Sequence, residues 1–325
     1  METDKRLSEL KEGDQFEGFY ILKAADVRTS SNGKPYLSAT LSDITAAIDA
    51  KMWDYSGRIG SEDEGRIVKI RADVQEFKGS LQLTLKKLRL ADENDEYSME
   101  MLVPCAPIDC EQETQHIREL IASMADEDYR RLSEEMLRRH IDTFVSIPAA
   151  KSVHHAFLSG LLMHTGAMLR LADFLATELY GKILNRSLLL TGTLLHDFAK
   201  EREYMRSELG LINDVTTEGR LLGHLVMGAE EVNQVGKELG IPEDKLLLLR
   251  HMLLSHHGEP EFGAAVIPCI AEAEVLYHVD LLDSRMEIYK ESLENVRPGT
   301  FSDKIYALEK RIYNHGITEN PTMII

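Results

Sequence analysis

The chain has 325 residues, 43% of them hydrophobic, which favours two folded domains with separate cores over one small domain. Its net charge of -18 argues against a protein that is basic over its whole surface. No segment approaches the roughly 20 apolar residues of a membrane span, and the first residues lack a secretory signal, so we expect a cytoplasmic protein with no membrane contact.

Residues 13–90 are predicted to form short strands. Apolar and polar residues alternate within segments that are bounded by Gly, Asn, Asp and Ser. Five strands in fewer than 90 residues fit a small barrel of the OB type. We expect these strands at residues 16–22, 36–41, 47–53, 67–74 and 81–85.

Charge is unevenly distributed along the chain. The acidic surplus falls after residue 90, whereas basic residues predominate between 66 and 89. A local basic face on the barrel is therefore compatible with the negative total. The basic residues of this segment are Arg66, Lys69, Arg71, Lys78, Lys86, Lys87 and Arg89, against the acidic Asp73 and Glu76.

Residues 91–110 are acidic, contain Pro104 and Pro107, and are predicted to form a linker. Apolar residues then recur at helical spacing to about residue 313. The expected helices are 112–123, 126–142, 153–180, 186–200, 219–239, 243–257, 268–292 and 302–313.

The chain is therefore predicted to be multidomain, with a small all-β OB-type barrel followed by an all-α helical domain. The barrel spans 1–90 and the helical domain spans 111–315, with residues 111–150 as its N-terminal helical extension. Residues 316–325 are expected to be a C-terminal tail.

Histidine gives the main chemical signal, because nine of the twelve histidines lie between residues 154 and 278. The three cysteines are an odd number without C-x-x-C spacing, which argues against a disulfide framework and a thiolate zinc site. Any metal is therefore expected to be held by imidazole and carboxylate groups.

His196-Asp197 follows an apolar helix, and this pair alone is weak evidence for a site. Other predicted helices carry further histidines or an aspartate among apolar residues, where an unpaired polar group is costly. A shared metal would satisfy all of them, and their number favours two ions over one. The further residues are His164, His224, His256, His257 and Asp280.

The order of these residues resembles the HD hydrolase superfamily, and together with the OB-type barrel it is similar to the YhaM family of 3′-to-5′ exoribonucleases. The matching segments are 151–157, 195–200, 218–224, 254–258 and 274–283. The resemblance implies an HD-type helical domain and hydrolysis of single-stranded RNA from its 3′ end, releasing nucleoside monophosphates. Single-stranded DNA stays open as a substrate.

The resemblance also implies how the residues share two divalent transition-metal ions. Manganese is the first choice, and iron, cobalt or zinc suit the same donors. Of the His256-His257 pair, His256 is preferred as the ligand. Asp283, one turn after Asp280, is a competing ligand, a hydrogen-bond partner of the ligands or a solvated helix residue. One ion is assigned to His164, His196, Asp197 and Asp280, and Asp197 bridges it to a second ion on His224 and the histidine pair.

Other residues are expected to contact the substrate. Lys200 is predicted to act with Asp197 in catalysis, by neutralising developing charge or by protonating the leaving 3′ oxygen. Lys151 and His155 are predicted to contact substrate phosphate, while Ser152 can instead cap a helix.

On the barrel, Tyr36 beside Lys34 is a predicted platform for stacked bases, whereas Trp53 is expected to fill the core.

Two other functions stay open. The same metal site could act on nucleotides or cyclic dinucleotides, with the barrel as a regulatory or assembly module. Alternatively, the chain could be a nucleic-acid-binding protein whose helical domain is structural. Homo-oligomerisation is also left open.

Overall fold

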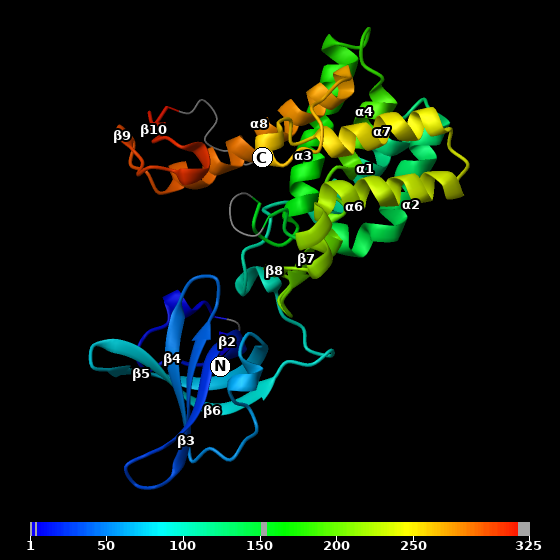
Figure 1. The fold of residues 1–325 in the computed structure, drawn as a ribbon. Helices are drawn as coiled ribbons and strands as arrows, with labels where there is room; N and C mark the ends of the chain where they lie inside the picture. Colours follow the sequence, from blue (N-terminus) through cyan, green and yellow to red (C-terminus); the bar gives the residue numbers. More distant parts are fainter. Residues whose placement is uncertain (1, 4, 151–154, 318–325) are drawn as a thin grey trace. The chain divides into compact units, whose positions relative to one another are not determined.

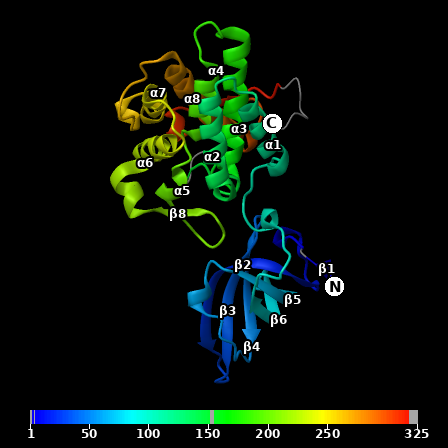
Figure 2. The same cartoon turned by 90° about the vertical axis from the view of Figure 1, so that its right-hand side faces the viewer.

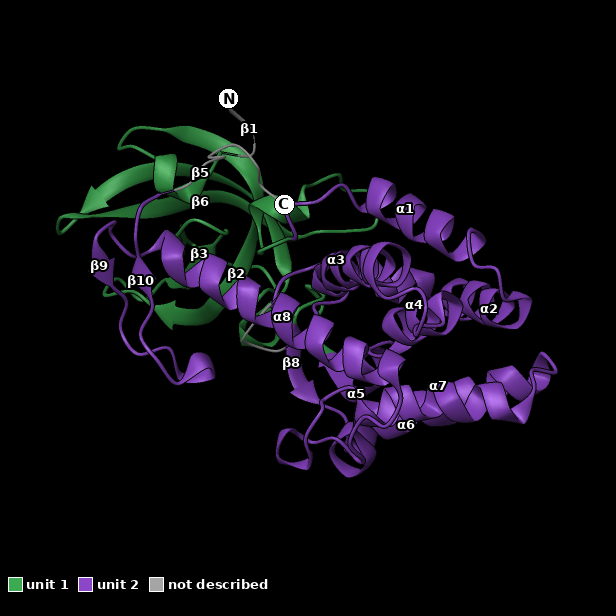
Figure 3. Cartoon of the chain, turned by 90° about the horizontal axis from the view of Figure 1, so that it is seen from above, with its two compact units in different colours: residues 1–105, 206–211 green, residues 106–205, 212–325 purple. Residues whose placement is uncertain are grey.

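The computed structural model describes residues 2–3, 5–150 and 155–317. The chain divides into two compact units (Figure 3), one of residues 1–105 with 206–211 and one of residues 106–205 with 212–325. The first unit is a β-barrel and the second is mainly helical. Over the described ranges, no helix is both long and apolar enough to cross a membrane.

Five long strands form the barrel (Figure 1). They are β2 (Gln15–Thr29), β3 (Pro35–Ser42), β4 (Ala47–Trp53), β5 (Ile67–Phe77) and β6 (Ser80–Leu90). They pair in the order β2-β3-β4-β6-β5, and β5 pairs back with β2, so the sheet closes. Only β4 and β6 are parallel among these five, and the short β1 (Glu2–Thr3) adds to β2. The predicted OB-type barrel is confirmed.

Alternation along the strands fills the barrel core. In β5, Val68, Ile70, Ala72 and Val74 are fully buried, and the residues between them point outward. Trp53 is a correction to the prediction, because it is 51% exposed and does not fill the core. Its position in β4 is in phase with the outward residues of that strand, since the inward Ala50 is three residues before it.

The second unit contains α1 to α8, and an Asp, Asn or Thr precedes four of these helices and accepts hydrogen bonds from their free N–H groups. The cap residues are Asp109, Asp126, Asn185 and Thr216. The helices are α1 (Cys110–Ala122), α2 (Glu127–Phe144), α3 (Gly160–Phe174), α4 (Arg186–Leu195), α5 (Lys200–Glu203), α6 (Thr217–Glu238), α7 (Glu243–Ser255) and α8 (Ala271–Glu294).

α4 is the central helix of this unit. Every residue from Ser187 to Leu195 is buried, and α4 contacts α2, α3, α7 and α8 (Figure 2). A helix that is buried on all sides needs neighbours around its whole circumference. The end of α4, where His196 and Asp197 follow, therefore lies in the interior of the unit.

Two predicted helices differ from the structure. Residues 302–313 form no α-helix, because Leu308 and Ile312 instead pack with Ile288 of α8 in a small separate cluster. Strands β9 (Thr300–Phe301) and β10 (Tyr313–Asn314) flank this segment as a hairpin. The helix predicted from 153 begins at 160, since His155 and Ser159 adopt positive φ angles of 49° and 61°. Between α5 and α6, β7 (Tyr204–Arg206) pairs with β8 (Ile212–Val215).

Candidate metal centre

His196 and Asp197 lie in the turn between α4 and α5. Nδ1 of His196 donates a hydrogen bond to the carbonyl oxygen of Thr193 at 2.7 Å, so Nε2 points away from the helix backbone. This Nε2 lies 3.3 Å from Oδ2 of Asp197. Both side chains are almost completely buried. The turn thus directs two successive polar side chains into the same interior space.

α3 and α8 bring a second set of side chains to this place. Nε2 of His164 lies 3.4 Å from Oδ1 of Asp280, and its Nδ1 donates to Oδ2 of Asp283 at 2.6 Å. Nε2 of His155 lies 2.9 Å from the same Asp283 oxygen. Asp283 therefore connects two imidazoles. Its donor atom and those of His155 and His164 lie within 4.8 Å of one another, so its role as a ligand or as a partner of the ligands stays a prediction.

α6 carries His224 directly after a kink. Gly223 has φ 73° and ψ 159°, a combination that is essentially restricted to glycine. The backbone N–H of His224 donates to Oε1 of Glu203 at 3.3 Å, and its Nδ1 lies 2.9 Å from Oε2. Glu203, the last residue of α5, therefore fixes both the backbone and the ring of His224.

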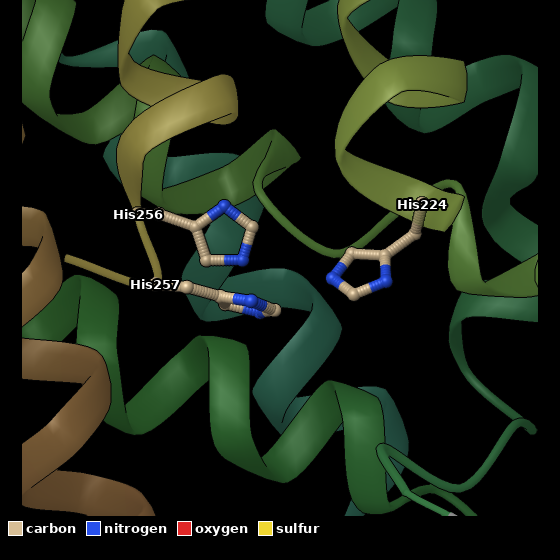
Figure 4. Close-up of side chains that lie close together, drawn as sticks. All are labelled: His224, His256 and His257. Carbon is tan, nitrogen blue, oxygen red and sulfur yellow. The ribbon is translucent and has the colours of Figure 1, made fainter. Parts of the chain in front are cut away.

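His256 and His257 follow the end of α7. Nδ1 of His256 donates to the carbonyl oxygen of Leu253 at 2.8 Å, the same local arrangement that holds His196. Figure 4 shows the rings of His256 and His257 facing that of His224. One nitrogen from each of these three rings lies within 4.8 Å of the other two.

Asp197 lies between the two groups of histidines. Its Oδ2 faces His196, whereas its Oδ1 is 3.4 Å from Nε2 of His224 and 3.8 Å from Nε2 of His256. The two oxygens of one carboxylate thus address two different sets of nitrogens. Asp197 is therefore close to the nitrogens of both groups.

Several buried atoms in this space have no hydrogen-bond partner among the described residues. Leaving such an atom unpaired costs about 1–3 kcal/mol. Because Nδ1 of each histidine concerned faces an oxygen and donates to it, Nε2 carries a lone pair. Lone pairs and a carboxylate oxygen directed at one space fit a divalent transition metal. The atoms are Nε2 of His196, His224 and His256, and Oδ1 of Asp197.

The charge states of His256 and Asp197 suit a cation. Burial lowers the pKa of His256 well below its usual value, so this ring is neutral and can bind a metal. Burial favours the neutral form of Asp197, but the adjacent Lys200 ammonium outweighs it and holds the pKa of this carboxyl well below its usual range. Neutral imidazole and ionised carboxylate therefore face each other.

Lys200 is a buried cation at the start of α5. Its Nζ lies 2.7 Å from Oδ2 of Asp197 and donates to the carbonyl oxygen of Ala149 at 2.9 Å. Burial opposes the charge, but Asp197 raises the pKa of Lys200 above its usual value. These two contacts use two of its three N–H donors.

Tyr36, Trp53 and Phe77 form an aromatic platform on the outer surface of the barrel, with Lys51 above it. The rings of Tyr36 and Trp53 have centroids 5.0 Å apart, and Nζ of Lys51 is 5.5 Å from Trp53 and 5.4 Å from Phe77. Trp53 and Phe77 are about half exposed. The predicted Lys34 lies beside this surface and pairs with Asp54 at 2.9 Å.

The predicted site residues are thus brought together to different degrees. The seven proposed metal ligands and Lys200 share one region of the helical unit, and Tyr36 and Lys34 share one surface of the barrel. The His155 side chain is 1% exposed and forms a hydrogen bond with Asp283, so its contact with substrate stays a prediction. Lys151 and Ser152 lie outside the described residues.

Glu203 was not predicted from the sequence. Nothing in its surroundings along the chain singles it out from the many other glutamates. Lys51 was not predicted as part of a site either, although its place in the sequence carries a signal. The alternation of β4 places Lys51 and Trp53 on the same outer face, two residues apart.

Comparison with known proteins agrees with this geometry. Residues 161–285 match the HD domain family, a metal-dependent domain, and all seven proposed ligands lie within that range. The 3′-5′ exoribonuclease YhaM of Geobacillus sp. (strain WCH70) is 37% identical over 307 residues, covering 93% of this chain and 92% of that protein. The YhaM of Listeria monocytogenes serotype 4b (strain CLIP80459) is 35% identical over 321 residues, covering 97% of this chain and 100% of that protein.

A solved structure, the second OB-fold domain of replication protein A from Methanococcus maripaludis, resembles part of the chain. It is 17% identical with a TM-score of 0.23, covering 29% of this chain and 100% of that domain. The identity to the two full-length relatives is the decisive finding. With more than a third of residues identical over nearly the whole length, the chain belongs to the YhaM family of 3′-5′ exoribonucleases.

Proposed function

We propose that this protein is a metal-dependent 3′-5′ exoribonuclease that hydrolyses single-stranded RNA and releases nucleoside monophosphates. The observation that carries the proposal is the set of unpaired buried atoms around Asp197. They form a cation site in a chain whose relatives are exoribonucleases. Single-stranded DNA is a second substrate to be tested with the same protein.

Two divalent cations are the proposed occupants. Their chemistry would be to lower the pKa of a bound water and to neutralise charge on the phosphate. Manganese is our first choice, and iron, cobalt and zinc suit the same donors. His257 is the alternative to His256. One cation is assigned to His164, His196, Asp197 and Asp280, and the other to Asp197, His224 and His256.

The residues of the chain itself hold this site in shape. Glu203 and Asp283 fix the rings of His224 and His164 through Nδ1, which directs Nε2 of each ring inward. Lys200 has one N–H donor beyond its contacts with Asp197 and Ala149. We assign that donor to a phosphate oxygen of the substrate, where a positive charge offsets the charge that develops during hydrolysis.

The aromatic platform of the barrel is the proposed site for the bases of the strand. Stacking on an aromatic ring contributes about 1–3 kcal/mol per base and is tolerant of sequence. Tyr36 and Trp53 present neighbouring rings, and Lys51 and Lys34 add positive charge beside them. Contact of this kind does not depend on the identity of the base.

Incubation of a 5′-labelled single strand with the protein and Mn2+ tests the proposal. We expect shortening in single-nucleotide steps with release of nucleoside monophosphates, and no shortening with His196→Ala or Asp280→Ala. Glu238→Gln, an exposed change on α6, is the control that should act like the parent. A strand that stays intact with the parent protein and each of the four metals would contradict the proposal.

Mononucleotides and cyclic dinucleotides are the comparison substrates. We expect the parent protein to hydrolyse them far more slowly than RNA. Faster hydrolysis of these small molecules than of RNA would support a phosphohydrolase with the barrel as a regulatory or assembly module.

A further inference from the structure

β5 and β6 carry a second charged surface of the barrel. We call it the basic face, and its cations line one hollow of about 460 Å³ together with Glu17, Met52, Ile70 and Leu88. No residue of the aromatic platform lines this hollow. The cations stand out in a chain whose net charge is -18. The basic face consists of Lys69 and Arg71 on β5, and Lys86, Lys87 and Arg89 on β6.

The register of the two strands concentrates these cations. Ala72 pairs with Leu85, but the next pair joins Arg71 to Lys87, so Lys86 is an extra residue in a β-bulge. Strict alternation after the buried Leu85 would turn Lys86 outward and Lys87 toward the core. Because of the bulge, both lysines are exposed.

The pairing also places like charges opposite each other. Arg71 is directly opposite Lys87, and Lys69 is directly opposite Arg89. Like charges in these positions destabilise a sheet. An anion between Arg71 and Lys87 would relieve this repulsion, because Glu17, which is opposite Arg71 on β2, pairs with Lys69 instead.

Three of the five cations already have carboxylate partners. Lys69 lies 3.6 Å from Glu17, Lys86 lies 3.1 Å from Asp73, and Arg89 lies 2.6 Å from Asp95. Arg71 and Lys87 form no ion pair with any residue that the structure describes. The cross-strand pair at the bulge is therefore the part of the basic face that is available to an external anion.

We propose that the basic face binds the phosphate backbone of single-stranded RNA, as a subsite separate from the aromatic platform. This inference rests on the substrate proposed above. A phosphate between Arg71 and Lys87 relieves their repulsion, and Met52 and Leu88 offer apolar surface to a sugar.

Binding of a labelled 20-nucleotide single-stranded RNA by the full chain, with a chelator present to prevent cleavage, tests the proposal. We expect Arg71→Thr/Lys87→Thr to reduce the slope of log affinity against log salt by about 0.7, the value for one lost phosphate contact in a single strand. Near 0.1 M salt the affinity should fall about fivefold. Threonine suits a strand, so the barrel should keep its fold.

The matched control is Lys23→Thr/Arg58→Thr, which removes two exposed positive charges from the same unit but outside the basic face. It should keep the slope of the parent, and Arg71→Lys/Lys87→Arg should restore it. An unchanged slope in Arg71→Thr/Lys87→Thr overturns the proposal, as does an equal loss in the control. The proposed function fails by a different result, namely no shortening of RNA by the parent protein with metal.

Discussion

The two oxygens of Asp197 face different histidines. Nδ1 of each of those histidines donates a hydrogen bond to another oxygen. His196 and His256 use a carbonyl three residues earlier in their own helices. His224 instead uses the carboxylate of Glu203, which belongs to another helix. A nearby carbonyl is present at any helix end, but a carboxylate must be placed by folding.

Glu203→Gln should weaken metal binding without removing a proposed ligand. Glutamine keeps the shape of the side chain but loses the charge that faces Nδ1 of His224. Loss of such a partner typically lowers metal affinity by roughly 10–100-fold. Calorimetric titration with Mn2+ measures it, with Glu238→Gln as the control that should bind like the parent. Equal affinities in all three proteins would show that Glu203 does not orient His224.

At the scale of elements, the ends of helices position the donors. His196 follows α4, His256 follows α7, and His224 follows the kink of α6. Successive side chains on a continuous helix point about 100° apart, so a helix cannot direct neighbours at one ion. A turn or kink removes that restriction.

Gly223→Ala tests the kink. The position is open, since the nearest atom to an added Cβ is Oε1 of Glu203 at 3.9 Å. The backbone angles are the obstacle, and we expect a loss of about 1–3 kcal/mol in the free energy of unfolding or a displaced His224 with loss of activity. Gly228→Ala on the same helix meets only ordinary contacts at 3.5 Å and should stabilise the helix by up to about 1 kcal/mol. Urea unfolding measures the stability and the RNA assay measures the activity. A Gly223→Ala protein that equals the parent in both would contradict the expectation.

His140 should make stability depend on pH. Its two ring nitrogens each lie 2.8 Å from a carboxylate, and hydrogen bonds with Glu201 and Glu231 raise the pKa of His140 from 6.5 to about 9. Because the folded state favours the cation, this stabilisation is complete below about pH 6.5 and is lost as pH rises through about 9. With allowance for solvent screening, His140→Asn should lower the free energy of unfolding by about 1–2 kcal/mol at about pH 6 and by less at about pH 9.5. Urea unfolding at both pH values measures the difference, and a loss that is equal at the two values would be inconsistent with this pairing.

At the scale of the whole molecule, strand capture and hydrolysis are assigned to different units. Trp53→Ala/Phe77→Ala should therefore raise the KM for a long RNA at least tenfold, at about 1–3 kcal/mol per lost stack, and leave kcat unchanged. Phe174→Ala removes an aromatic ring of similar exposure from α3 and should behave like the parent. Steady-state rates on a long strand and on a dinucleotide separate the two effects. A fall in kcat with unchanged KM would show that the aromatic platform does not bind the substrate.

Local patterns predicted much of this molecule. Each of the five predicted strands falls within an observed strand, because alternation is a property of neighbouring residues. The order of histidines and aspartates along the chain identified side chains that the structure places together. The bulge at Lys86 and the partners of the histidine rings could not be predicted in this way. They depend on the register of a distant strand and on the packing of separate helices, as with Glu203 and His224.

The unpaired atoms at the end of α4 connect the lifetime of the protein to its metal supply. An ion that binds only the folded chain stabilises it by about 2.7 kcal/mol when its free concentration is a hundred times the dissociation constant. Without metal, buried donor atoms at the enclosed end of α4 have no partner, and this destabilises the folded chain. Scarcity of metal would then shorten the survival of the folded enzyme as well as stop its reaction.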